Sequence, residues 1–337
     1  MADFTILGQG LAGSLLAWAL QRTGAMVRLV DRPVPGAASL VAPGLVNPLS
    51  GRKFTTNWRA AEARPAATAF YAELEDALGQ RFWHATPLLR LPRDADQAHA
   101  LAARQNEPAA ATHIAETFAP GSFADTLDDA HGSFLTAGAG WLDVSGLVER
   151  LRGKWLAEGA LQETEATLDD LDGTVIDCRG WRAAQDPAWA FIPWKPARGE
   201  ILDLAIPNEA LVPRIYNRGE WLVPVGAGQW RAGATYAWSR FDAPPEIGAR
   251  LQLEGQLRQW VRVPWHVTGQ RCGVRPIVHD FRPVLGRHPA TPHWFIFNGL
   301  GSHGVSQGPL CAQWLAAHLR ENTPLPAEVD VARFAGA

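Results

Sequence analysis

The chain opens with three apolar segments that differ in the spacing of their apolar side chains. Residues 4–7 form a short apolar run, residues 12–23 repeat apolar side chains at helical intervals, and residues 26–30 form a second run that ends at Asp31. Short runs of this kind are typical of buried strands. The pattern therefore predicts a strand, a helix and a second strand, which together make one β–α–β unit.

The rest of the chain alternates between loop, helix and strand patterns. Residues 32–53 are rich in Pro, Gly, Ala and Ser, and they predict an extended loop that covers another part of the protein. Helical spacing predicts helices at 59–78, 97–105, 147–157, 245–261 and 309–320, and apolar runs predict strands at 173–177, 199–204, 221–225, 229–236 and 294–297. The strands after residue 196 indicate an antiparallel sheet. The expected fold is α/β at the start and α+β overall.

Composition narrows the class of protein. The chain has 337 residues, 47% of them hydrophobic and 19% charged, which favours two packed structural units over disorder. Its net charge of −3 gives no electrostatic reason to expect a nucleic-acid partner. The three cysteines are too few for a disulfide framework or a zinc site, so we expect no metal and a cytoplasmic location. The apolar stretch 4–20 is interrupted by glycine and follows Asp3, so neither a secretory signal nor a membrane partner is expected.

The turn between the first strand and the first helix carries the main chemical motif. It reads Gly8-Gln9-Gly10-Leu11-Ala12-Gly13, the GxGxxG spacing of a dinucleotide-binding turn. Gly8 allows the turn, Gly10 lets the backbone approach a pyrophosphate, and Gly13 allows close helix–strand packing. Asp31 ends the second strand, where a carboxylate accepts hydrogen bonds from a ribose, and Arg32 beside it is a further cofactor candidate. The alternative is an ordinary glycine-rich turn followed by a surface carboxylate.

Six further short motifs lie later in the chain. They are residues 38–44 (ASLVAPG), 47–52 (NPLSGR), 175–180 (VIDCRG), 198–200 (RGE), 273–276 (GVRP) and 299–305 (GLGSHGV). With the turn at 8–13, they resemble the FAD-dependent D-amino-acid oxidase superfamily, particularly glycine oxidase and the flavin domain of the bifunctional tRNA methylaminomethyl-thiouridine enzyme. The resemblance implies a Rossmann-type FAD-binding domain (1–80, 140–195 and 268–337) with a discontinuous antiparallel-sheet substrate domain (81–139 and 196–267).

The same resemblance implies residues that contact FAD. Backbone and small side chains dominate there, because a chain that lies flat along a ring has no room for bulk. The implied contacts, besides those of the first turn, are Ser39, Ala42, Gly44, Gly180, Gly299, Gly301, Ser302, His303 and Gly304. Cys272 lies near the position at which some relatives attach flavin, but it is one residue out of register with Asp280. We therefore expect FAD to be bound non-covalently.

Four side chains are candidates for the substrate site. In the relatives that the motif resembles, the arginine of GVRP binds the substrate carboxylate, which makes Arg275 the expected clamp; the alternative is a structural ion pair with Asp280. Tyr236 is expected to line the site. His303 is either a substrate contact or a hydrogen-bonded turn residue. Arg52 is either an anion ligand or a surface charge.

The resemblance implies a reaction. A small amine or amino acid would be oxidised by hydride transfer to flavin N5, with dioxygen as the electron acceptor. Three alternatives remain open. They are a 2-hydroxy-acid dehydrogenase that passes electrons to a quinone or carrier, cleavage of a secondary amine on modified tRNA, and a nucleotide-binding protein with no redox function.

Overall fold

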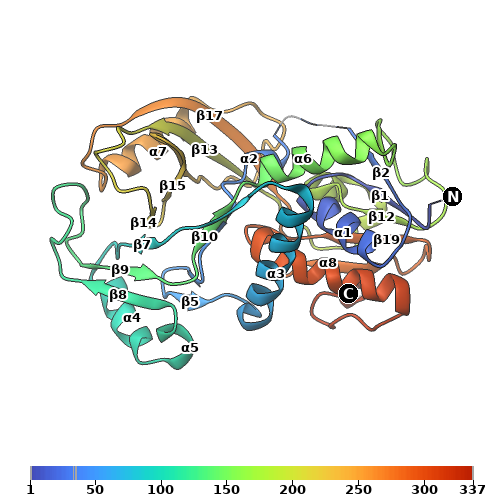
Figure 1. The fold of residues 1–337 in the computed structure, drawn as a ribbon, viewed down its shortest axis with the longest axis horizontal. Helices are drawn as coiled ribbons and strands as arrows, with labels where there is room; N and C mark the ends of the chain where they lie inside the picture. Colours follow the sequence, from blue (N-terminus) through green and yellow to red (C-terminus); the bar gives the residue numbers. More distant parts are fainter. Residues whose placement is uncertain (1, 33, 35, 336–337) are drawn as a thin grey trace.

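The computed structural model describes residues 2–32, 34 and 36–335, and it contains two large sheets (Figure 1). The first has six strands in the order β11-β2-β1-β12-β19-β18. All of its pairs are parallel except β18 with β19. The strands are β1 (Phe4–Leu7), β2 (Val27–Asp31), β11 (Leu161–Glu163), β12 (Val175–Asp177), β18 (Val284–Arg287) and β19 (Trp294–Asn298).

Helices from both ends of the chain cover this sheet. The blue α1 (Leu11–Arg22) lies beside the red α8 (Gly304–Glu321), and α3 (Ala60–Leu78) packs on α8 (Figure 1). Their apolar faces join that of α6 (Val144–Ala157) in a core with buried side chains of the sheet, among them Ile6, Leu29 and Phe297. The opposite face packs against the short helices η1 (Gly180–Gln185), η2 (Pro187–Trp189) and η3 (Val331–Phe334).

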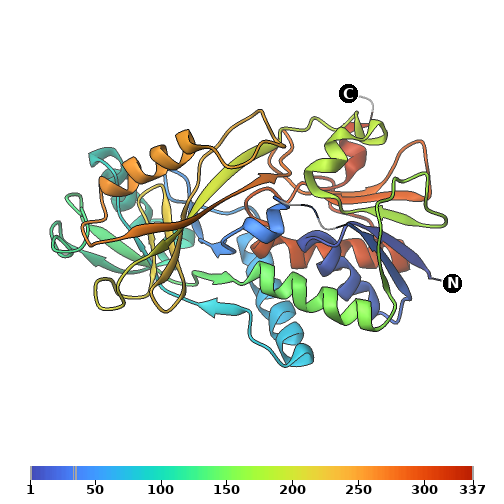
Figure 2. The same ribbon diagram turned by 90° about the horizontal axis from the view of Figure 1, so that it is seen from above.

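The second sheet has eight strands in the order β17-β13-β16-β15-β14-β7-β9-β8. Its pairs are antiparallel except β14 with β7. The strands are β7 (Leu88–Arg90), β8 (Ile114–Phe118), β9 (Ser133–Thr136), β13 (Ala197–Ala205), β14 (Ile215–Asn217), β15 (Trp221–Gly226), β16 (Gln229–Gly233) and β17 (His266–Arg275). The helix α7 (Ile247–Arg258) covers one face with a leucine-rich core, and Figure 2 shows it lying along β13 and β17.

Shorter elements lie between these strands along the chain. They are α2 (Ala38–Val41), β3 (Leu45–Val46), β4 (Leu49–Ser50), β5 (Thr55–Thr56), β6 (Trp83–Ala85), α4 (Ala95–Gln105), α5 (Pro108–Ala111) and β10 (Gly140–Leu142). β10 pairs with β3 and with β6, so a three-stranded sheet ties the loop after α2 to the rest of the chain. The segment 32–53, expected to be an extended loop, therefore contains one short helix and two short strands.

The predicted α/β and α+β fold is confirmed, and its mixed sheets match that class. One element differs clearly from the expectation. The last helix was predicted to begin near Pro309, but it begins at Gly304 with Pro309 inside. Proline cannot donate a hydrogen bond to the carbonyl four residues earlier, and here the Val305 carbonyl accepts one from the Tyr71 hydroxyl at 2.9 Å instead. A side chain of α3 thus supplies the donor that the helix lacks.

The assigned domain boundaries stay a prediction. Most of β17 falls within the predicted FAD-binding segment 268–337, yet it pairs with β13 from Ala197↔Arg275 to Ala205↔His266 at the edge of the eight-stranded sheet. Within the described residues, no helix combines the length and apolar character needed to cross a bilayer.

Candidate active site

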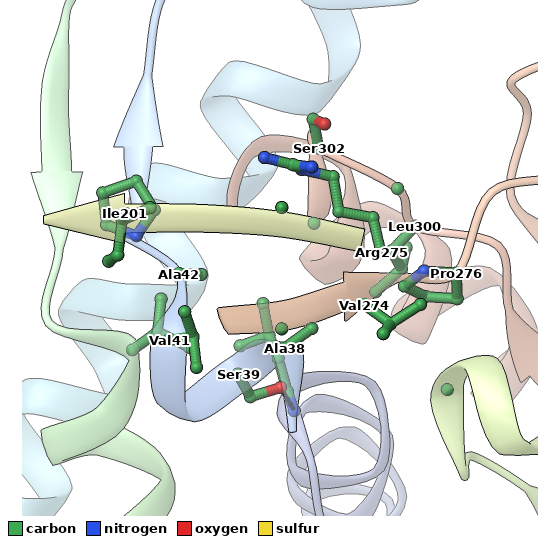
Figure 3. Close-up of a pocket in the computed structure, with 18 of the residues that line it drawn as sticks. Ala38, Ser39, Val41, Ala42, Ile201, Val274, Arg275, Pro276, Leu300 and Ser302 are labelled. Carbon is green, nitrogen blue, oxygen red and sulfur yellow. Dashed lines mark hydrogen bonds between the residues drawn. The ribbon is translucent and has the colours of Figure 1, made fainter. Parts of the chain in front are cut away.

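A cavity of about 1210 Å³ lies between the two sheets. Its wall comes from the glycine turn after β1, α2 and the loop that follows it, the end of β17, and the turn before α8. Figure 3 shows these pieces converging, with Ser39 on one side and Arg275 and Ser302 on the other. Pockets for single drug-sized ligands occupy roughly 300–1,000 Å³. This cavity therefore has room for an extended cofactor and a substrate together.

The turn at 8–13 fits a dinucleotide because its backbone is packed too closely at Gly8 and Gly13 for a side chain. Gly8 has φ +102°, and a Cβ there would lie 2.8 Å from the Cys178 carbonyl. A Cβ on Gly13 would lie 1.9 Å from the Gly8 oxygen, so this glycine lets α1 pack on the turn. Gly10 lines the cavity and is the N-cap residue of α1. Bare backbone therefore faces the place where a pyrophosphate would lie.

The N-terminus of α1 faces the same space. Leu11 and Ala12 line the cavity, and the first turn of the helix carries no acidic side chain. The Ser39 hydroxyl accepts a hydrogen bond from the Leu11 N–H at 2.9 Å. Unsatisfied amides and the helix dipole at such an end favour an anion. Ser39 thus fixes the entry to the helix beside the expected phosphate position.

Asp31 is held by partners from two other segments. Its Oδ1 accepts the Gln9 N–H at 3.0 Å, and its Oδ2 lies 2.7 Å from Nη1 of Arg152 in α6. Arg152 also pairs with Glu163 at 2.7 Å. The sequence motif predicted Asp31 but not Arg152, which is 121 residues away. This ion pair orients the carboxylate expected to bind a ribose.

Arg32 lies outside the cavity wall, although it was a cofactor candidate. Its guanidinium forms an exposed ion pair with Glu165. Successive side chains of an extended chain point to opposite sides. Since Asp31 faces the cavity, its neighbour is directed away from it.

The loop after α2 passes along the cavity on small residues. Ala42 and Gly44 both line it. Gly44 has φ +69°, and a Cβ there would lie 1.8 Å from the Leu142 oxygen. The Leu142 N–H donates to the Gly44 carbonyl at 3.1 Å, which holds the loop against β10. The geometry suits a chain that lies flat along a planar ring.

The turn before α8 forms the facing wall. Gly301, Ser302, His303 and Gly304 line the cavity, as does Gly180 at the start of η1; Gly299 is not part of the wall. A Cβ on Gly299 would meet the Val284 backbone nitrogen at 3.1 Å, which explains the need for glycine there without a cofactor contact.

Asn298, which the sequence did not single out, joins the start of η1 to the turn before α8. Its Nδ2 donates to the Gly180 carbonyl at 2.8 Å and its Oδ1 accepts the Gly299 N–H at 2.9 Å. Asn298 also lines the cavity. A lone polar residue at the end of an apolar strand carries no motif, so only the structure identifies its role.

Arg275 is the cationic group at the end of β17. Its guanidinium crosses β13 above Gly199, where a Cβ would lie 2.3 Å from Nη1. Its Nη1 lies 3.4 Å from the Thr235 carbonyl, and its Cζ lies 4.2 Å from the centre of the Tyr236 ring. Burial lowers the pKa of Arg275 from its ordinary value.

No carboxylate pairs with Arg275 among the described residues. Asp280, the alternative partner, instead pairs with Arg333, whose Nε lies 2.9 Å from Oδ2. A guanidinium that has lost part of its hydration favours a site where an anion replaces the lost water. The arrangement therefore supports the carboxylate-clamp interpretation over the ion pair with Asp280.

The other three candidates surround the cavity in different ways. Tyr236 is 55% exposed at its mouth, with the hydroxyl 3.3 Å from Ser302 Oγ. His303 precedes α8 and lines the cavity, and burial lowers the pKa of its imidazole. Arg52 lines the far end and forms an exposed ion pair with Asp94 at 2.9 Å. Cys272 also lines the cavity, with its Sγ 3.6 Å from the Ala243 carbonyl.

The fold and the cavity define a dinucleotide-binding oxidoreductase with its substrate space beneath an antiparallel sheet. Comparison with known proteins agrees: the family described as "DAO: FAD dependent oxidoreductase" matches residues 3–318. The chain belongs to this FAD-dependent family, and the resemblance seen in its motifs is confirmed. The residues of the glycine turn, α2 and the turn before α8 fit FAD.

Curated relatives cover nearly all of this chain. The tRNA 5-methylaminomethyl-2-thiouridine biosynthesis bifunctional protein MnmC of Maricaulis maris is 29% identical over 341 residues, 96% of this chain and 53% of that protein. The protein of the same name from Chromohalobacter salexigens is 26% identical over 97% of this chain and 54% of its own length. The chain thus spans about half the length of these relatives.

Solved structures share the fold along its whole length. Glycine oxidase from Geobacillus kaustophilus has a TM-score of 0.80 at 22% identity, covering 99% of this chain and 97% of that one. Iminodiacetate oxidase from Chelativorans sp. BNC1 has a TM-score of 0.78 at 21% identity, covering 96% and 97%.

Proposed function

We propose that this chain oxidises a small amine or amino acid whose carboxylate is bound by Arg275. The observation that carries the proposal is the half-buried guanidinium of Arg275, which lines the cavity and has no carboxylate partner among the described residues. A planar guanidinium can bind a carboxylate through two parallel hydrogen bonds, and so fixes the orientation of the α-carbon. The names of the structural neighbours, glycine oxidase and iminodiacetate oxidase, favour this class of substrate.

The cofactor supplies the redox chemistry and the protein supplies the orientation. FAD held in this cavity would supply the acceptor for a hydride from the carbon that bears the amine. The residues proposed to hold it are Gly10, Leu11 and Ser39 near the phosphates, Asp31 at the ribose, and Ala42, Gly44 and the turn 301–304 at the ring. Arg275 fixes the carboxylate, and Tyr236 closes the mouth beside Ser302.

No side chain needs to act as a general base in this scheme, because the uncharged amine already carries the lone pair that assists loss of hydride. The lowered pKa of His303 keeps its imidazole neutral near pH 7, so it adds no second charge to the cavity. Overall, one amine and one dioxygen give an imine and hydrogen peroxide, and water then hydrolyses the imine. Dioxygen as the acceptor is part of the proposal.

The test is anaerobic reduction of the flavin. The purified protein is mixed with amino acids, the corresponding amines without carboxylate, and 2-hydroxy acids, and loss of the visible flavin band is recorded. We expect bleaching by an amine-containing carboxylate. Bleaching by 2-hydroxy acids alone would replace this function by that of a hydroxy-acid dehydrogenase, and no bleaching by any member of the three classes would contradict the proposal.

A second candidate is oxidation of an amine carried by a tRNA nucleoside. The curated relatives are named for biosynthesis of 5-methylaminomethyl-2-thiouridine in tRNA. Near the mouth, Tyr236 and Trp238 are 55% and 52% exposed with ring centres 6.3 Å apart, and the Lys195 Nζ lies 5.1 Å from the Trp238 ring. Exposed aromatic and cationic side chains can stack an unpaired base. Faster bleaching by an aminomethyl-modified tRNA than by any free amino acid would favour this candidate.

A further inference from the structure

The sheet wall of the cavity carries one continuous row of side chains. Ile201 of β13 and Trp221 of β15 are both register partners of Gly233 in β16, and Asn217 of β14 is the partner of both Trp221 and Arg90 of β7. Residues directly opposite on neighbouring strands point to the same face. Apart from the glycine, every member of the row lines the cavity.

The middle of the row is apolar because of that glycine. A Cβ on Gly233 would lie 2.8 Å from both Ile201 Cγ2 and Trp221 Cζ2. These two side chains therefore occupy the space above the glycine and form an apolar floor. The floor lies between the Arg275 end of the cavity and the Arg90 end.

Arg90 is buried at the far end of the row without a carboxylate partner among the described residues. Its side chain is only 6% exposed and its Nε has no hydrogen-bond partner. Its Nη2 donates to the Gly51 carbonyl at 3.0 Å, and its Cζ lies 5.0 Å from the centre of the Phe54 ring. None of these contacts neutralises its charge.

The arginines on either side of it are already neutralised. Arg93 pairs with Glu220 at 2.8 Å and Arg52 with Asp94 at 2.9 Å. Burial, and then the charge of Arg93, lower the pKa of Arg90 to about 10, so it is still charged near pH 7. An unpaired buried charge is costly unless an anion reaches it.

We propose that Arg90 is a second anion site and that the natural substrate carries a carboxylate or phosphate at the end remote from its amine. The inference rests on the proposed function, since it takes the first carboxylate to be bound by Arg275. β13, which the Arg275 guanidinium overlies, and β7 are four strand spacings apart in the sheet. Four spacings amount to about 19 Å along a flat sheet. The substrate is thus an elongated dianion whose apolar middle lies over Ile201 and Trp221.

The first test measures binding to the wild-type holoprotein and needs no turnover. A series of α,ω-dicarboxylates of increasing length is titrated by calorimetry beside monocarboxylates of equal length. One added charge-assisted hydrogen bond is worth roughly ten-fold in affinity. We expect dicarboxylates of one intermediate length range to bind at least about ten-fold more tightly than their monocarboxylate partners. Equal affinity at every length would overturn the second site.

The second test uses variants with a matched control. Arg90→Met keeps the aliphatic packing on Phe54 but removes the charge, and it should abolish the dicarboxylate preference while FAD content stays normal. Arg287→Met removes an arginine that also lies over a phenylalanine, with Cζ 5.2 Å from the Phe295 ring centre, but outside the cavity wall. It should keep the preference. Loss of preference in both variants, or in neither, would show that Arg90 has only a structural role.

Further measurements show which anion binds at Arg90, and they distinguish failure of this proposal from failure of the proposed function. Analogues with a phosphate in place of the distal carboxylate identify which anion the site takes, and a length-dependent gain for either supports it. If no amine bleaches the flavin but the preference depends on Arg90, the proposed function fails while the second site stands. Bleaching by amines without any preference gives the opposite result. Should Arg90→Met fail to fold, the wild-type length series still decides the matter.

Discussion

Gly199→Ala should displace the substrate clamp without touching the cofactor. The added Cβ would lie 2.3 Å from Arg275 Nη1, 2.6 Å from Nη2 and 2.7 Å from Cζ, and these are its three nearest atoms. Ordinary contact with a Cβ begins at 3.4 Å, so the guanidinium must retreat by about 1.1 Å. Since the displaced group is the end of a flexible side chain, the fold should tolerate the change.

The expected cost follows from this displacement. A misplacement of about 1 Å in a positioning group can lower a rate by roughly 100-fold, which corresponds to about 2.7 kcal/mol. The assay is kcat/KM for an amino acid and for the amine that lacks its carboxylate. We expect the large loss only for the amino acid, because only that substrate uses the clamp.

Gly255→Ala is the matched control. It adds the same methyl group to an exposed position of α7 where a Cβ meets nothing within 4 Å. This variant should have wild-type kinetics. The reasoning is refuted if Gly199→Ala keeps full activity on the amino acid, or if both substrates lose activity equally while FAD content falls.

Three further predictions concern the clamp, the cofactor turn and the pH dependence of stability. Arg275→Lys keeps the charge but loses the paired donors, so kcat/KM should fall far more for a carboxylate substrate than for its decarboxylated amine; an equal fall would make the residue structural. Gly10→Leu should abolish FAD binding, measured as flavin absorbance per chain, because a Cβ already lies 3.1 Å from Ser39 Oγ and the rest of the side chain enters the phosphate space. Burial lowers the pKa of His303 below 6.5, so the unfolded chain binds this proton more readily than the folded one. Stability should therefore decline as pH falls below about 6.5 and level off beneath the folded-state pKa. In denaturant titrations, His303→Asn should show a smaller decline over that window, and an unchanged slope would contradict the assignment.

The cofactor turn could be predicted because its determinants are local. The spacing of Gly8, Gly10 and Gly13 between a strand and a helix encodes close contacts that the structure shows at those positions. The four-residue motif 273–276 led to Arg275 through the family resemblance, and this residue lines the cavity. Arg32 was a candidate because it follows Asp31 in sequence, but side chains alternate along an extended chain, and Arg32 pairs with Glu165 outside the cavity wall.

The supporting residues could not be predicted, because their partners lie far away in sequence. Arg152 reaches Asp31 across 121 residues, and Asn298 reaches Gly180 across 118. The position of Arg90 follows only from the register of five strands, which places it in one row with Ile201. Periodicity predicts which strands exist, but it does not determine which residues face one another across a sheet.

The strand order also has a consequence for biosynthesis. β1 pairs with β12, Thr5 opposite Val175, and β12 pairs with β19, Val175 opposite Trp294. Contacts between such distant segments form slowly, and most of them must wait until the later strands leave the ribosome. Both walls of the FAD site therefore exist only after the turn that follows β19 has left the ribosome, and FAD binding then stabilises the assembled fold by mass action. The cellular supply of FAD should consequently govern how much of this protein survives proteolysis, as well as how active it is.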